Sequence, residues 1–174
     1  MDGIAADGNS ADRIAADGIG LPASINGQAW RVAWCPPPAP PPGAPHGAEA
    51  VCVADGRVVV VSRDGRRWGL PAGRPEPGEG WADTLRREVR EEACAEVTDR
   101  RLLGFSHGVC VRGPQEGLVL VRSMWRAEVR PGPWRPRFEM SHRRLLAPAE
   151  ALASLTVPEG LGPFYRRLFA EAAL

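Results

Sequence analysis

The most regular hydrophobic pattern in the chain lies between residues 48 and 63. Ala50–Ala54 is apolar, Asp55 and Gly56 form a turn signal, and Val58–Val61 is a β-branched run. An Asp-Gly pair between two apolar runs is a strong short-range signal for a β-hairpin. The pattern therefore predicts two paired strands in this segment.

A different spacing of apolar residues marks Trp81–Ala93. Trp81, Leu85 and Val89 recur every four residues, with Ala82 and Ala93 beside them. Residues spaced in this way share one face of a helix. We predict an amphipathic helix whose apolar face packs on a sheet and whose opposite face carries the charged side chains.

Other apolar runs predict the remaining elements. Strands are expected at residues 29–34, 101–105 and 118–129, with a shorter one ending at 145–146, and helices are expected at 148–155 and 163–173. The chain therefore mixes strands and helices, which is typical of an α+β or α/β domain.

The N-terminal segment has a different composition. Residues 2–20 contain the sequence IAADG twice, at Ile4–Gly8 and Ile14–Gly18, and offer little that could face a core. Such composition favours disorder. We expect a flexible, low-complexity tail over residues 1–25 and a single domain over residues 26–174.

A proline-rich run interrupts the predicted strands. Residues 36–45 hold seven prolines in ten positions. Proline cannot donate a hydrogen bond in a sheet interior, so this run predicts a stiff surface loop or linker. The alternative interpretation is a ligand for an aromatic-lined groove of a partner.

Composition narrows the classes of partner and location. The chain has 174 residues, 22 basic and 21 acidic, and a formal charge of +1, which gives no global field for nucleic acid or a membrane surface. The four cysteines show no metal or redox spacing, and no apolar run approaches a membrane span. We expect a cytoplasmic protein without nucleic-acid or membrane partners, and a homodimer remains open.

The charged face of the predicted helix belongs to a longer motif. Residues 73–95 read GRPEPGEGWADTLRREVREEACA, which resembles the Nudix box. In that box Gly, five residues, Glu, seven residues, Arg-Glu, an apolar residue, any residue and Glu-Glu follow in fixed order. The matching positions are Gly73, Glu79, Arg87, Glu88, Val89, Glu91 and Glu92. Seven matches at fixed spacing are far more specific than a lone short motif.

The resemblance to the Nudix hydrolase superfamily covers most of residues 48–155. It implies an α+β fold, an α/β/α sandwich in which a mixed sheet lies between helices. It also implies hydrolysis of a phosphoric anhydride bond in a nucleotide-like diphosphate substrate. One departure concerns Cys94, which stands where the family has a glycine suited to the left-handed end of a helix. Cysteine there costs about 1 kcal/mol or forces a different helix exit.

The glutamates have a physical interpretation that does not need the family. Glu88, Glu91 and Glu92 are spaced i, i+3 and i+4, which places three carboxylates on one helical face. A solvated face neutralised by neighbouring arginines is the plain alternative. The spacing from Gly73 and Glu79 favours instead a site for Mg²⁺, with Mn²⁺ as a substitute, because hard cations bind jointly to carboxylates and phosphates.

The resemblance assigns roles to these residues. Glu88 and Glu92 are expected to ligate the metal with the assistance of Glu91, and the backbone carbonyl of Ala72 is a further expected ligand. Arg87 is expected to orient the carboxylates. Its helix-stabilising pair with Glu91 at i, i+4 is the plain alternative.

Further residues complete the predicted site. Gly73 and Glu79 are structural, and Glu79 is expected to brace the loop before the helix. Outside the box, Glu139 and then Glu116 are the candidate general bases, and His142 is a weaker one. Arg63 and Arg74 could bind a phosphate and Trp134 could stack on a base, with solvated surface as the alternative for the arginines.

Two functions of different classes follow. The first is a magnesium-dependent hydrolase that cleaves a diphosphate linkage in a nucleoside diphosphate joined to another group. The second is a nucleotide-sensing or interaction module that keeps the fold without catalysis. The intact set of three glutamates favours the first, because a pure binder has no reason to retain mutually repelling carboxylates.

Overall fold

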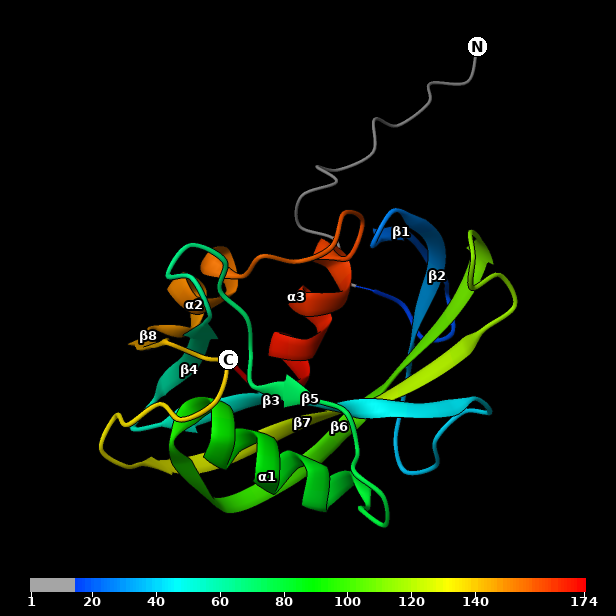
Figure 1. Cartoon of the computed structure of the whole chain (residues 1–174). Helices are drawn as coiled ribbons and strands as arrows, with labels where there is room; N and C mark the ends of the chain where they lie inside the picture. The colour runs from blue at the N-terminus through cyan, green and yellow to red at the C-terminus, as the bar shows by residue number, and fades with distance from the viewer. Residues whose placement is uncertain (1–14) are drawn as a thin grey trace.

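The fold is one mixed sheet with helices on both faces, as a computed structural model that describes residues 15–174 shows (Figure 1). The strands are β1 (Leu21–Ile25), β2 (Gln28–Cys35), β3 (Ala44–Ala54), β4 (Arg57–Ser62), β5 (Ala72–Gly73), β6 (Ala95–Arg112), β7 (Val119–Pro131) and β8 (His142–Leu146). The helices are α1 (Trp81–Ala93), α2 (Pro148–Ser154) and α3 (Gly162–Glu171).

The sheet has the strand order β1-β2-β6-β7-β3-β4-β8, and β5 pairs with β3. Strands β3 and β7 run parallel, and the other pairs are antiparallel. Cys52 pairs with Val59 across the turn at Asp55 and Gly56, both of which have positive φ. The predicted hairpin is therefore confirmed.

Helix α1 lies on one face of the sheet, and α2 and α3 lie on the other (Figure 1). The side chains of β3 point alternately to the two faces of the sheet. Ala50 and Cys52 belong to the same core as Leu85 and Val89 of α1, whereas Val51 belongs to the core on the opposite face. Small side chains under α1 let the helix approach the sheet closely. The predicted sandwich is confirmed.

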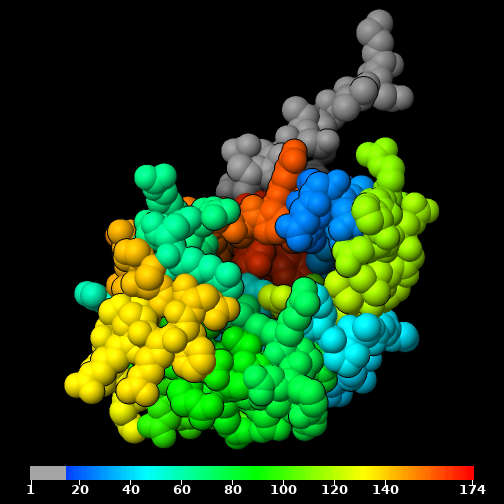
Figure 2. Space-filling view, in the orientation of Figure 1, coloured from blue at the N-terminus to red at the C-terminus, as the bar shows by residue number. Residues whose placement is uncertain are grey.

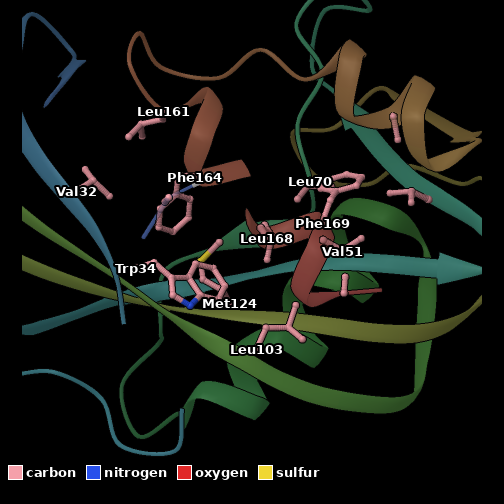
Figure 3. Close-up of a cluster of buried hydrophobic side chains, with 14 of the residues drawn as sticks. Val32, Trp34, Val51, Leu70, Leu103, Met124, Leu161, Phe164, Leu168 and Phe169 are labelled. Atoms are coloured by element: carbon pink, nitrogen blue, oxygen red, sulfur yellow. The ribbon is translucent and has the colours of Figure 1, made fainter. Parts of the chain in front are cut away.

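The larger core lies between the sheet and α3 (Figure 3). Trp34 is fully buried, and its ring lies 5.4 Å from the ring of Phe164 on α3, centroid to centroid. Leu168 and Met124 are also buried in this cluster. These contacts fix α3 against the middle of the sheet.

The predicted boundary of the tail at residue 25 is wrong. Residues 21–25 form β1, and Ala15, only 1 % exposed, donates its N–H to the carbonyl of Pro163. Asp17 also forms an ion pair with Arg167 of α3. The partners of this segment come from remote parts of the chain. The first IAADG repeat, at residues 4–8, lies outside the described residues.

The proline-rich loop is shorter than predicted. Residues 36–43 connect β2 to β3, but Ala44 and Pro45 already pair with Leu120 and Val121 of β7. Proline is tolerated there because the other side of β3 is paired only from Ala48 onward, so no neighbouring strand requires the missing N–H.

Among the described residues, no helix is long and apolar enough to cross a membrane.

Candidate active site

Helix α1 presents a cluster of three carboxylates, Glu88, Glu91 and Glu92, toward the loop that precedes it. Glu92 is buried, with 4 % of its surface exposed. The side chains of Glu88 and Glu91 are 12 % and 22 % exposed. A solvated charged face is thereby excluded for this side of the helix, because the carboxylates are covered rather than open to water.

Strand β5 lies directly against this carboxylate cluster. The backbone N–H of Ala72 donates to Oε2 of Glu92 at 2.9 Å. Ala72 pairs with Glu49 of β3, which fixes the strand on the sheet. The structure thus brings Ala72 and Glu92 together through the N–H, and the ligand role of the Ala72 carbonyl stays a prediction.

Gly73 touches the carboxylate of Glu88 so closely that no side chain fits. A Cβ built on Gly73 would lie 1.8 Å from Oε1 of Glu88 and 1.9 Å from its Cδ. The φ angle of Gly73 is not positive, so the requirement for glycine is space rather than backbone conformation. This contact gives a physical reason for glycine at the first position of the box.

Arg87 holds the carboxylate cluster and the loop together. Its Nη1 lies 2.7 Å from Oε1 of Glu88 and 3.3 Å from Oε2 of Glu91. Its Nε donates to Oε1 of Glu79 at 2.8 Å, and its Nη2 donates to the carbonyl of Arg74 at 2.7 Å. One guanidinium therefore orients two carboxylates of the helix and ties the loop to them.

Glu79 braces the start of the helix. Its Oε2 accepts hydrogen bonds from the backbone N–H of Glu76 at 2.9 Å and from the hydroxyl of Thr84 at 3.0 Å. The hydrogen bond from Arg87 is the main reason why the pKa of Glu79 falls to about 2. Glu79 is therefore an anion near pH 7, and its hydrogen bonds join the loop to the start of the helix.

Burial makes the carboxylate cluster electrostatically unfavourable when it stands alone. The pKa of Glu92 is raised to about 7, chiefly by burial and also by the nearby charges of Glu88 and Glu139, while the hydrogen bond from Ala72 acts in the opposite direction. Burial also raises the pKa of Glu88, against the opposing effect of Arg87. The carboxylates are thus held close together without enough positive charge to balance them.

The residues fit a divalent cation in donor chemistry, because buried, mutually repelling carboxylate oxygens are what Mg²⁺ and Mn²⁺ bind. Within residues 15–174, however, no three His, Cys, Asp or Glu side chains form a ready-made metal group. Glu88 and Glu91 contact Arg87 instead.

Glu139 is the candidate base that the fold brings near the carboxylate cluster. It lies in the loop between β7 and β8, and its charge acts on both Glu88 and Glu92. Arg63 forms an ion pair with it, Nη2 to Oε1 at 2.8 Å. Both side chains are more than half exposed, so Arg63 and Glu139 stand together at the open edge of the site.

The two other candidate bases lie elsewhere. The ring of His142 packs near Trp68, 6.4 Å between ring centroids, and its Nδ1 lies 2.9 Å from the hydroxyl of Ser141. Glu116 lies in the turn between β6 and β7, where its N–H bonds to the carbonyl of Gly113. Neither residue is among the groups that act on the pKa of Glu88 or Glu92.

A cavity of about 260 Å³ opens on the α3 face of the sheet. Figure 2 shows the hollow, bordered by β1 (blue), the β6–β7 turn (yellow-green) and the loop before α3 (orange). Arg74 lines it and also follows Gly73 in the chain. The cavity and the carboxylate cluster are therefore neighbours joined by the loop after β5.

The side of the cavity near Arg74 is charged. Glu49 is 6 % exposed, and its carboxylate accepts hydrogen bonds from Arg122 at 3.2 Å and from the hydroxyl of Tyr165 at 3.0 Å. Burial and then the charges of Arg122 and Arg74 lower the pKa of His46 to about 4. His46 is therefore neutral near pH 7, and the cationic groups here are the two arginines.

Sequence reasoning missed Glu49, Arg122 and Tyr165. The signal for Glu49 was present, because it is a single acid within the apolar run of β3 and a buried acid needs partners. Trp134, the predicted stacking residue, does not line the cavity, and the guanidinium of Arg143 lies 5.1 Å from the centre of its ring.

Cys94 ends α1 with φ 47° and ψ 47°, the left-handed conformation that favours glycine. Its N–H donates to the carbonyl of Val89. The helix exit is therefore kept, and the alternative of a different exit is wrong. The strain of a non-glycine residue in this conformation remains, about 1 kcal/mol.

Comparison with known proteins finds one matching family model and several solved structures with a similar fold. A model of the NUDIX domain matches residues 44–168. The pyrophosphohydrolase BsRppH of Bacillus subtilis is 22 % identical with a TM-score of 0.58, over 78 % of this chain and 80 % of that one.

Two further solved structures share the fold. A NUDIX hydrolase from Nitrosomonas europaea is 21 % identical with a TM-score of 0.56, over 75 % of this chain and 91 % of that one. The ORF135 protein of E. coli is 21 % identical with a TM-score of 0.55, over 74 % and 91 %. A comparison with curated protein sequences finds no match.

Proposed function

Because the chain belongs to the NUDIX domain family, we propose that it is a divalent-cation-dependent hydrolase that cleaves a diphosphate linkage in a nucleoside diphosphate joined to another group. The observation that carries the proposal is the buried carboxylate cluster Glu88, Glu91 and Glu92 packed against Ala72 and Gly73. Sequence spacing and three-dimensional packing both support this location.

The carboxylate cluster would hold the cation, Mg²⁺ or Mn²⁺, through Glu88 and Glu92 with the help of Glu91. When bound, a divalent cation supplies Lewis-acid chemistry, because it lowers the pKa of a bound water and offsets phosphate charge. Arg87 keeps Glu88 and Glu91 in place, and Gly73 lets the backbone of the loop approach Glu88.

Glu139 is the residue best placed to accept a proton from the attacking water. It is exposed beside the carboxylate cluster, and its partner Arg63 is exposed with it. Arg63 could bind a substrate phosphate oxygen in exchange for Glu139. Arg74 and Arg122 face the cavity and could bind the part of the diphosphate that lies farther from the helix.

The solved structures support the class of bond rather than the substrate. BsRppH is described as a pyrophosphohydrolase, and cleavage of a pyrophosphate-type linkage agrees with a carboxylate cluster that has arginines at its open edge and in the adjacent cavity. The cytoplasmic location and a homodimer stay predictions.

The test is a panel of nucleoside triphosphates, ADP-ribose, sugar nucleotides and dinucleotides, assayed with Mg²⁺ or Mn²⁺ and again with excess chelator. We expect turnover of at least one compound that disappears with chelator and returns with added cation. Full turnover in chelator would contradict the metal role. Nucleotide binding without turnover of any compound would favour the sensing module.

A further inference from the structure

The cavity has a second end, away from the arginines, that the proposed function does not use. Glu49 of β3 pairs with Met124 in the middle of β7, whereas Gln115 lies in the turn where β6 passes into β7. Gln115 lines the cavity together with Ile25, Asn26 and Trp30 from the first two strands and their turn. This end is therefore formed by loops and turns at the rim of the sheet.

A hydrogen bond from Gln28 orients the side chain of Gln115, which is exposed at the rim of the cavity. The backbone N–H of Gln115 donates to Oε1 of Gln28 at 2.9 Å. This bond decides which atom of the Gln28 amide is oxygen, so the Nε2 of Gln28 is the atom that donates to Oε1 of Gln115 at 2.9 Å. The oxygen of Gln115 is thereby engaged, and its NH₂ group is left as a donor.

Glycine at position 113 is needed for this arrangement. Gly113 has φ 136°, and a Cβ there would lie 2.7 Å from Cγ of Gln28. The turn can therefore lie directly on Gln28. Contacts of backbone and side chain together hold the β6–β7 turn to the start of β2, and they pre-organise the amide of Gln115.

A second donor lies in the same wall. Trp30 lines the cavity, is 5 % exposed, and its buried Nε1–H has no hydrogen-bond partner among the described residues. A buried donor without a partner is uncommon and is stabilised when an acceptor reaches it. A small displacement of the side chains that cover this N–H would accompany such contact.

The other side chains at this end are mostly apolar. Ile25, Leu120, Leu161 and Phe164 are apolar residues that line the same cavity. At about 260 Å³, the cavity is slightly smaller than most sites for drug-sized ligands. A cavity of this size and lining therefore suits one compact, flat ring system that carries a hydrogen-bond acceptor on its edge.

We propose that this end of the cavity binds the heterocyclic base of the substrate through a ring carbonyl, with the NH₂ group of Gln115 as the specificity-determining donor. The proposal rests on the proposed function, because it names the class of base in the nucleotide. A carbonyl oxygen has two lone pairs and can accept from donors on both sides. An exocyclic amino group is itself a donor, so at this place it would face the donors of the cavity without an acceptor. A base with such a group should therefore bind more weakly.

The same geometry orients the substrate. A base near Gln115 and Trp30 places the sugar toward Arg122 and Arg74, and the diphosphate then leaves the cavity past Arg74 toward the carboxylate cluster. Bases with a ring carbonyl opposite the sugar, such as guanine and uracil, are expected to bind more tightly than adenine and cytosine.

Binding of the four nucleoside 5′-monophosphates tests this inference. GMP, UMP, AMP and CMP contain no phosphoric anhydride bond, so calorimetric titration of the full-length protein with Mg²⁺ is independent of hydrolysis. We expect GMP and UMP to bind about tenfold more tightly than AMP and CMP, the effect of about one hydrogen bond.

Two variants make the test specific. Gln115→Glu replaces the donor by an acceptor of the same shape and should reverse the order, so that AMP and CMP bind more tightly. Gln28→Ala removes the bond that orients Gln115 and should narrow the spread between the bases to less than about threefold. Val111→Ala, at an exposed residue of the same hairpin that does not line the cavity, is the matched control and should leave the order unchanged.

Equal binding of all four compounds, no binding of any of them, or an unchanged order in Gln115→Glu would overturn the inference. Melting temperatures of the variants show whether each one is folded. Misfolding could explain a loss of base selectivity only if both Gln28→Ala and Gln115→Glu were unfolded. Turnover on the substrate panel without an effect of Gln115 would overturn this inference alone. Base selectivity without turnover would overturn the proposed function alone.

Discussion

The carboxylate cluster and the cavity lie on either side of the loop after β5, but they are assembled in opposite ways. The carboxylates of the cluster and the residues that hydrogen-bond to them lie between Ala72 and Glu92, and these hydrogen bonds span at most twenty positions, whereas the candidate base Glu139 comes from the loop between β7 and β8. The residues of the cavity come from β1, β2, β3, β6, β7, α3 and the loops between them. The carboxylate cluster is therefore built mainly from local sequence, whereas the cavity is built by the whole fold.

This difference suggests a division of roles. Contacts within the box fix the charges that any substrate of this chemistry needs, and they involve backbone positions that only certain residues can occupy. The cavity contacts come from segments that can vary independently, such as the β1–β2 turn and the β6–β7 turn. Changes in the carboxylate cluster should therefore abolish turnover, whereas changes in the cavity should alter which substrate is used.

The largest expected effect concerns Glu92. Glu92→Gln keeps the shape of the side chain but removes one cation-ligating charge, so turnover of the best substrate should fall by about a thousandfold. Arg122→Gln, a cavity variant, should mainly raise the KM. Steady-state kinetics of both variants checks the contrast. Equal changes in kcat for the two would erase the distinction between the two regions.

Gly73 offers a purely steric test. Gly73→Ala places a Cβ where Oε1 of Glu88 now lies, so the carboxylate must move, and turnover should fall by about a hundredfold. Gly69→Ala is the matched control, because Gly69 has open space around its Cβ position and no positive φ. Comparable loss of turnover in both variants would show that the contact with Glu88 is unimportant.

The N-terminal segment gives a stability effect. Residues 15–20 contribute buried Ala15, the bond from the N–H of Gly18 to the carbonyl of Trp34, and the ion pair of Asp17 with Arg167. Deleting residues 2–20 rather than 2–14 should cost about 2 kcal/mol and lower the melting temperature by about 4–8 °C. Identical melting curves for the two truncations would show that residues 15–20 do not stabilise the fold.

The smallest expected effect is at Cys94. Cys94→Gly removes the strain of the left-handed conformation and should stabilise the protein by about 1 kcal/mol without altering turnover. Thermal unfolding and the standard assay measure both. A drop in turnover would mean that the Cys94 side chain takes part in positioning α1.

Sequence alone predicted the helix and the carboxylate cluster well, because both depend on contacts within a short stretch. The apolar spacing of Leu85 and Val89 set the buried face, and the box set the positions of the charges. The hairpin at Asp55 and Gly56 followed from turn chemistry for the same reason. Local signals of this kind need no knowledge of the remaining chain.

The failures have the opposite cause. Residues 15–25 resemble a tail by composition, but Ala15 is buried by Pro163 and by α3, which lie almost 150 positions away. Glu49 and Tyr165 meet across 116 positions. Pro45 enters β3 only because no strand pairs with its open side. The lone acid in an apolar run marks Glu49 as a residue that needs partners, but no pattern within a window of sequence identifies the remote partner in any of these cases.

We propose that Glu88, Glu91 and Glu92 form a cation site whose charges repel one another when no cation is bound. Melting temperature with excess chelator and with Mg²⁺, for wild type and Glu92→Gln, tests it most directly. Mg²⁺ should raise the melting temperature of the wild type by several degrees and that of the variant much less, because binding stabilises only the folded state. In chelator the variant should melt at the same or a higher temperature than the wild type, since the substitution removes a buried charge. An identical response of both proteins to Mg²⁺, or none in the wild type, would contradict the account.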